Sequence, residues 1–252
     1  MTTRKRIRRL AAPIAVVLAL GLAWSLAVHV SGVLPLLLPG PAEVLGAAIE
    51  DGPKLMREAR ATLYEVMASA LLAVAAGFST AIGLGSMPTA RRIVFPYILA
   101  TQVMPKVALA PILIAWLGTG APSRLTLAFL IAYFPMVINT LAGLASPGEA
   151  ALRYAQSLAA SDSQILLKLR LPAALPFIMS GIKITVALSV VGIVVGELVA
   201  SDAGLGLVII ESMASMDTSL AVAATFLIGL IGLVLVALLE LIERRVVYWQ
   251  TG

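Results

Sequence analysis

The residues that could act on a solute lie inside long apolar stretches of this sequence: Gln102, Lys106, Asn139 and Glu197. Charged side chains are costly there, since each adds roughly 2.5–3.5 kcal/mol to the free energy of inserting a helix when it lies at the helix centre. An ammonium group at that depth could attract an anionic or polar solute, and a carboxylate could line a path or close it. We therefore treat these four residues as candidates for a translocation path or gate.

Lys106 lies between Pro105 and Pro111, and Gln102 lies one turn earlier on the same helix face. The two prolines remove backbone donors, so we expect this helix to be kinked or locally unwound. Such breaks are tolerated in membranes where they line a cavity. Two interpretations remain open: Lys106 faces the path, or it pairs with a neighbouring helix and is structural.

The apolar stretch 177–200 has two different faces. Its small residues fall within about 80° of each other at 100° per residue, which favours close helix packing: Gly181, Thr185, Ser189, Gly192 and Gly196. Lys183 and Glu197 fall on the opposite side, and Lys183 can extend to the membrane surface. Glu197 either serves the path or gate, or forms a structural ion pair or is exposed at the interface. Asn139, with Thr140, either joins helices by hydrogen bonds or lines the path.

The composition is that of a membrane protein. Mean hydropathy is +1.02 and charged residues make up 12% of the chain, about half the share expected of a soluble domain. Six stretches are long enough for spanning helices, so we predict an all-α polytopic fold in one transmembrane domain over residues 1–252, with spans at about 10–30, 61–85, 93–117, 125–145, 177–200 and 220–241.

The distribution of Lys and Arg predicts the orientation of the chain. With the N-terminus inside, twelve basic residues are cytoplasmic: Arg4, Lys5, Arg6, Arg8, Arg9, Arg91, Arg92, Arg153, Lys168, Arg170, Arg244 and Arg245. Four are outside: Lys54, Arg57, Arg60 and Arg124. Both termini and the 146–176 loop are therefore expected in the cytoplasm.

The 146–176 loop is expected to form two short helices at the membrane surface. Residues 149–158 give one amphipathic helix, and Ser161 with Gln164 makes a capping box that starts a second. Pro172 is expected to end this second helix, because the residue before a proline is disfavoured in helical conformation. The alternative is a solvated connector without a partner.

Several features of the sequence argue against a catalytic site in this chain. There is no Gly-x-x-x-x-Gly-Lys-Ser/Thr phosphate loop, so the chain is not expected to bind ATP. We predict no catalytic residue and no metal site, since no nucleophile–base set or metal-ligand cluster is recognisable and the single His29 is expected at the membrane interface. Cys is absent, which excludes disulfides.

The loop resembles that of the inner-membrane permease subunit of binding-protein-dependent ABC importers, in the nitrate, taurine and aliphatic-sulfonate branch. That family carries E-A-A-x-x-x-G in the loop, then an apolar residue and Leu-Pro. Arg153 stands where the family usually has Glu, and Ala159 where it usually has Gly. On this resemblance the ATPase-coupling residues are Arg153, Tyr154, Ala155, Leu158, Ala159, Ala160, Ser161, Leu171 and Pro172.

Further matching segments are Leu38-Pro39-Gly40-Pro41, Pro105 to Gly118, Phe134-Pro135, Gly196-Glu197, Gly204-Leu205-Gly206 and Leu241 to Arg245. The resemblance implies a type I importer architecture and a homodimer with the pore on its two-fold axis. It also implies two cytoplasmic ATP-binding cassette subunits that hold ATP and Mg, and an extracytoplasmic solute-binding protein.

The resemblance implies a small polar or anionic organic solute: a heterocyclic vitamin precursor, a sulfonate, an aromatic acid or a nitrate-like ion. The run 105–111 is more similar to vitamin-precursor members. The alternative of an ion-driven secondary transporter predicts midplane carboxylates and inverted repeats, and the alternative of a membrane enzyme predicts paired catalytic residues on facing spans. The sequence shows no repeat and no convincing pair.

Overall fold

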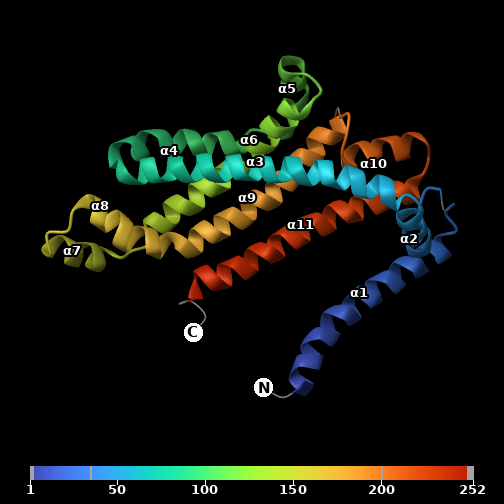
Figure 1. Cartoon of the computed structure of the whole chain (residues 1–252), viewed down its shortest axis with the longest axis horizontal. Coiled ribbons are helices and arrows are strands. Elements are labelled where there is room, and N and C mark those ends of the chain that lie inside the picture. The colour runs from blue at the N-terminus through green and yellow to red at the C-terminus, as the bar shows by residue number, and fades with distance from the viewer. Residues whose placement is uncertain (1–2, 35, 200, 249–252) are drawn as a thin grey trace.

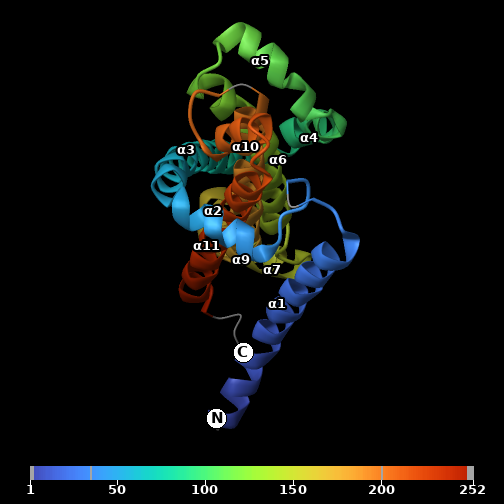
Figure 2. The ribbon, with the colours of Figure 1, turned by 90° about the vertical axis from the view of Figure 1, so that its right-hand side faces the viewer.

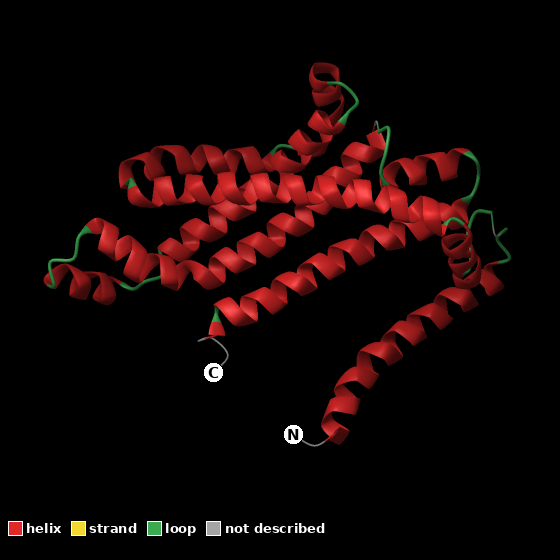
Figure 3. Ribbon diagram, in the orientation of Figure 1, coloured by secondary structure: helices red, strands yellow, loops and turns green. Residues whose placement is uncertain are grey.

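The computed structural model describes residues 3–34, 36–199 and 201–248, with side chains from residue 15 onward except at 17 and 88. Every regular element of this described part is a helix (Figure 3). In chain order they are α1 (Thr3–Ser31), α2 (Pro41–Glu50), α3 (Gly52–Ser86), α4 (Pro88–Val103), the 3₁₀-helix η1 (Lys106–Leu109), α5 (Ala110–Leu117), α6 (Ala121–Leu144), α7 (Glu149–Ser157), α8 (Asp162–Ile165), the π-helix η2 (Leu166–Arg170), α9 (Leu171–Val199), α10 (Leu205–Ala214) and α11 (Thr218–Val246).

Within the described residues, four continuous helical segments are long and apolar enough to span a membrane: 52–86, 121–144, 162–199 and 218–246. They correspond to the predicted spans at 61–85, 125–145, 177–200 and 220–241, although residue 200 itself lies outside the described residues. The predicted span at 10–30 lies within α1, which is helical over its whole length. Its side chains are described only from residue 15, so the described apolar piece, 18–31, does not test this span. By length and composition, the described residues thus give four spans, or five if the broken pair below counts as one span.

The predicted span 93–117 is broken, as its prolines predict. The helical pieces on either side of residues 104–105 are bent by 82°, and Lys106 begins the 3₁₀-helix that follows Pro105. Neither Pro105 nor Pro111 can donate a backbone hydrogen bond, so a straight α-helix through this segment would lack two of its bonds. In Figure 1, α5 projects from the rest of the molecule beyond this bend.

The prediction that Pro172 ends a helix is wrong. The segment 162–199 is continuously helical, and Leu171 before the proline has helical angles, φ −66° and ψ −45°. The wide turn of η2 ends just before Leu171 and Pro172, and there the regular i→i−4 hydrogen bonds are already interrupted. The missing N–H of Pro172 therefore falls where the regular pattern is already broken. A π turn is a known way of accommodating such a break. The elbow formed by α7 and α8, residues 149–165, therefore continues through η2 directly into α9.

The helices α3, α6, α9 and α11 form the elongated body of the molecule (Figure 1). The α7–α8 elbow lies at one end, and α2 and α10 lie at the other. The long helix α1 slopes away from this body in both views (Figure 2). Trp24 of α1 contacts Phe226 of α11, with ring centroids 5.7 Å apart.

The predicted small-residue face of α9 packs against α6. All five of its residues are buried, and a Cβ atom on Gly192 would lie 2.5 Å from the Cα of Ala128. Along the same face Gly196 lies against Arg124 and Gly181 against Asn139. Close approach of this kind replaces the hydrophobic driving force that lipid cannot supply.

We predict that Gly192→Ala lowers the free energy of unfolding by about 1–3 kcal/mol, because the added methyl group overpacks the α6–α9 contact. The matched control is Gly229→Ala in α11, where a Cβ atom meets nothing within 4 Å. Denaturant unfolding of the detergent-solubilised protein measures both. Equal stability of the two variants would contradict the close contact.

Candidate functional site

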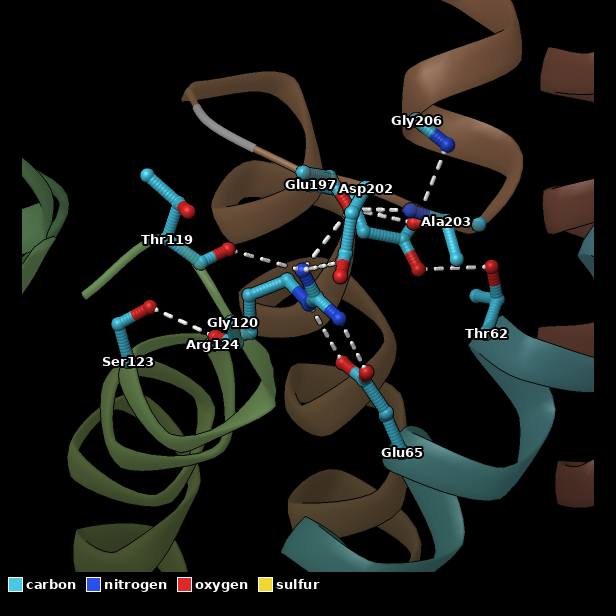
Figure 4. A network of polar contacts seen from close by, with 12 residues as sticks. Thr62, Glu65, Thr119, Gly120, Ser123, Arg124, Glu197, Asp202, Ala203 and Gly206 are labelled. Atoms are coloured by element: carbon cyan, nitrogen blue, oxygen red, sulfur yellow. Dashed lines mark hydrogen bonds and ion pairs between the residues drawn. The ribbon is translucent and has the colours of Figure 1, made fainter. Parts of the chain in front are cut away.

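A buried ionic network joins three helices near the end of the molecule that carries α10 (Figure 4). Arg124, in the first turn of α6, forms two parallel hydrogen bonds with the Glu65 carboxylate of α3, at 2.6 and 2.8 Å. Both side chains are at least nine-tenths buried. Two-pronged contact with a carboxylate is the strongest geometry available to arginine.

The remaining guanidinium nitrogen of Arg124 holds the turn that follows α9. It donates to the hydroxyl of Ser201 at 2.9 Å and to the carboxylate of Asp202 at 3.0 Å. The guanidinium holds the pKa of exposed Asp202 below its usual range, because it stabilises the charged form. The sequence predicted only that Arg124 lies outside the membrane. In the structure this one side chain links α3, α6 and the α9–α10 turn.

Glu197 lies beside this network and is also enclosed. Its carboxylate accepts hydrogen bonds from the Thr62 hydroxyl and from the backbone N–H of Gly206, both at 2.8 Å. A Cβ atom on Gly204 would lie 2.1 Å from this carboxylate, and the φ of Gly204 is +107°. Glycine is therefore required at this turn. In this conformation Glu197 joins α9, α3 and α10, and its role as a gate remains a prediction.

Helix α7 ends in a Schellman motif, in which the residues after the helix donate hydrogen bonds back to its last turn. The N–H of Ala160 donates to the carbonyl of Ala155 at 3.2 Å, and that of Ala159 donates to Gln156 at 2.9 Å. Ala159 takes the left-handed conformation, with φ +55°. The alanine thus adopts the geometry for which glycine is preferred, at a cost of roughly 1–2 kcal/mol.

The predicted capping box at Ser161 is present. The Ser161 hydroxyl accepts from the N–H of Gln164, and the Gln164 side chain accepts from the N–H of Ser161. The directions of both helices that flank Ala159 are therefore fixed: α7 on its N-terminal side and α8 on its C-terminal side. Ile165 of α8 is buried, and η2 packs on α9 and α6.

The outer surface of the elbow carries exposed apolar side chains. Tyr154 and Leu158, four residues apart on α7 and its C-cap, are 68% and 65% exposed. Arg153 is also exposed and pairs with Glu149 at 2.9 Å. The other predicted coupling residues lie on the same loop: Ala155, Ala160 and Leu171 are half-buried, while Ala159, Ser161 and Pro172 are exposed.

Lys106 packs on an aromatic ring. Its ammonium lies 4.9 Å from the ring centroid of Phe134 on α6, which is within the range of a cation–π contact. Among the described residues it forms no ion pair, whereas Lys183 pairs with Glu243 of α11 at 2.8 Å. Gln102 is exposed on α4. Asn139 donates to the carbonyl of Pro135 on its own helix at 2.8 Å.

Residues 71–248 match the model of a family described as the inner membrane component of binding-protein-dependent transport systems. The chain belongs to this family. The taurine transport system permease protein TauC of Escherichia coli is 32% identical over 86% of this chain and 81% of its own length. The riboflavin transport system permease protein RibX of Chloroflexus aurantiacus is 33% identical over 91% and 86%.

A solved structure shows the same fold. It is an inward-facing form of the MetNI methionine ABC transporter, with a TM-score of 0.56 and 20% identity, covering 73% of this chain and 94% of that chain. The chain is therefore a multi-pass inner-membrane permease of the ABC importer fold. Helix α10, which follows the turn held by Arg124, and the α7–α8 elbow lie toward opposite ends of the molecule (Figure 1).

Sequence reasoning missed Glu65 and Thr62. Glu65 lies within the predicted span 61–85, and no other Asp or Glu occurs from there to Glu149. A lone carboxylate in an apolar span needs a cation, and Arg124 starts the span that follows the broken one. That signal was available, but pairing the two across 59 residues required the fold.

We predict that Arg124→Met lowers the free energy of unfolding by about 3–5 kcal/mol, because it leaves the Glu65 carboxylate buried without a partner. Arg57→Met is the control: Arg57 pairs with Glu58, but its side chain is 73% exposed, so the change is expected to stay within about 1 kcal/mol. The double variant Arg124→Met/Glu65→Met should recover most of the loss. Failure of the double variant to recover would refute the ion-pair explanation.

We predict different outcomes for Lys106→Met and Lys183→Met. Lys183→Met strands the Glu243 carboxylate and should lower the unfolding midpoint in detergent. Lys106→Met removes a charge that has no acidic partner among the described residues, and it should leave that midpoint within the error of measurement. A large loss for Lys106→Met would show that this lysine is structural, the interpretation opposed to a path role.

Proposed function

We propose that this chain is the permease subunit of an ATP-driven importer, in which the α7–α8 elbow receives the force of separate ATPase subunits. The observation that supports this is an exposed apolar surface on a rigid elbow. Tyr154 and Leu158 face outward, while the Schellman motif and the capping box fix their direction. A movement of α7 would pass through α8 and η2 into α9, since these are one continuous helical segment.

The proposed complex contains two copies of the permease, two cytoplasmic ATP-binding cassette subunits that hold ATP and Mg, and an extracytoplasmic solute-binding protein. Both termini and the elbow lie in the cytoplasm in this proposal, which follows the bias of Lys and Arg. ATP binding would draw the two elbows together and open the path to the outside. The chain itself supplies the path and the mechanical coupling.

The proposed solute is a small polar or anionic organic molecule. Two relatives are named for the transport of such molecules, one for taurine and one for riboflavin. Lys106 supports it, because its charge is half-buried on the broken helix and is not neutralised by an acid among the described residues. With Gln102 it is proposed to line the path, with Asn139 behind it and Glu197 near the outer end. Ligand-induced stabilisation of the cognate binding protein would identify the solute.

We predict that Tyr154→Ser/Leu158→Ser abolishes recovery of the ATPase subunits in a pull-down from detergent extracts. Both side chains are exposed, so the permease itself should insert and unfold as the unaltered chain does. Met213→Ser, 56% exposed on α10 at the opposite end, is the matched control and should recover the ATPase fully. Normal recovery with the double elbow variant would refute the proposed coupling surface.

A further inference from the structure

A second polar site lies beside the elbow, where α4 begins. Three arginines surround a cavity of about 390 Å³: Arg91 and Arg92 from the first turns of α4, and Arg170 from the last residue of η2. Gly85, Phe95 and Pro96 complete the lining. The three cations come from two segments that are 78 residues apart or more, so the fold, and not the local sequence, gathers them.

Few acidic groups lie near these arginines: among the described residues, Asp162 lines an adjoining pocket with Arg170 but forms no ion pair with it. The sequence holds no Asp or Glu between Glu65 and Glu149, and none of the three is in an ion pair within the described part of the chain. Arg91 lies over the ring of Phe95, at 6.0 Å from its centroid. Three like charges around one cavity repel each other unless an anion joins them.

Arg170 supplies a donor that has no acceptor among the described residues. One of its terminal nitrogens donates to the carbonyl of Gly85 at 3.4 Å, which is a long bond. Its Nε is buried and has no hydrogen-bond partner in the described structure. A buried donor without an acceptor is unfavourable by about 1–3 kcal/mol, so native proteins rarely leave one. Arg170 lines the cavity, so an anion there would lie beside this side chain.

The surroundings of the cavity indicate the origin of that anion. Directly after the two arginines, α4 exposes Ile93 and Tyr97, which are 60% and 71% exposed. An exposed apolar strip next to basic residues is typical of a helix that enters the lipid, and tyrosine is common at the level of the headgroups. A molecule that presents both a phosphate and acyl chains fits both parts.

We propose that Arg91, Arg92 and Arg170 bind the phosphate of an anionic phospholipid, whose acyl chains lie along α4. The lipid bridges the start of α4 to the base of the elbow. This inference does not depend on the solute or on the ATPase. If the proposed function holds, the lipid also links the two moving parts, since α4 leads to the broken helix at Lys106 and η2 leads to the elbow.

The test uses the purified, delipidated permease in detergent. Binding of phosphatidylglycerol is measured by native mass spectrometry and by the shift of the unfolding midpoint, with phosphatidylcholine and inorganic phosphate as comparison ligands. Each basic residue near a membrane surface contributes about 1 kcal/mol to anionic-lipid binding, so Arg91→Gln/Arg92→Gln should weaken the affinity roughly tenfold to thirtyfold. Arg170→Gln should weaken it as well.

The matched control is Arg244→Gln/Arg245→Gln, an exposed basic pair in the last turn of α11 that does not line the cavity. It should keep the affinity within about twofold of the unaltered chain. Equal phosphatidylglycerol affinity for the Arg91→Gln/Arg92→Gln variant and the unaltered chain would overturn the proposal. So would stabilisation by inorganic phosphate as large as that by the lipid, or a loss limited to ATPase recovery, which would assign the arginines to an acidic surface of a partner protein.

Discussion

The close contact between the backbones of α6 and α9 sets where the neighbouring helices can pack. Gly192 and Gly196 allow the two backbones to meet, with Ala128 and Arg124 opposite them. Lipid gives no hydrophobic reward for bringing helices together, so packing and polar links must supply the energy. The small-residue face provides the packing, and the ion pair between Arg124 and Glu65 provides the link to α3.

The ion pair is possible only because this contact is so close. Gly196 lies within 3.1–3.2 Å of Arg124, measured from the position that a Cβ atom would take, so any side chain there would displace the arginine. With Arg124 in place, Glu65, Ser201 and Asp202 are all within its reach. Glu197 then fixes the start of α10 through the glycines of its turn. One face of small residues thus determines the position of the arginine that links α3, α6 and the α9–α10 turn.

Local rules predicted the features whose causes are local. The capping box at Ser161, the break at Pro105 and the packing face from Gly181 to Gly196 each follow from residues within about one helix. Pro172 was misjudged because the π turn before it, which makes the proline tolerable, has no sequence signature of its own. The Arg124–Glu65 pair could not be predicted, because residues 59 positions apart meet only through the topology.

The charged and polar groups of the described structure differ in whether they find a partner inside it. Arg124, Glu65 and Glu197 find their partners inside the chain, as does Asn139 on its own helix. Moving Arg124 or Glu65 would break a buried ion pair without a substitute, and that suits a frame. Lys106 and Gln102 differ, since they lie on the broken segment of the bundle, half-buried and exposed. The contact with the Phe134 ring holds Lys106 less rigidly than an ion pair would, because an aromatic ring offers no directional acceptor. In the proposed path role, this polar surface on the helix that the prolines break would exchange one partner for another.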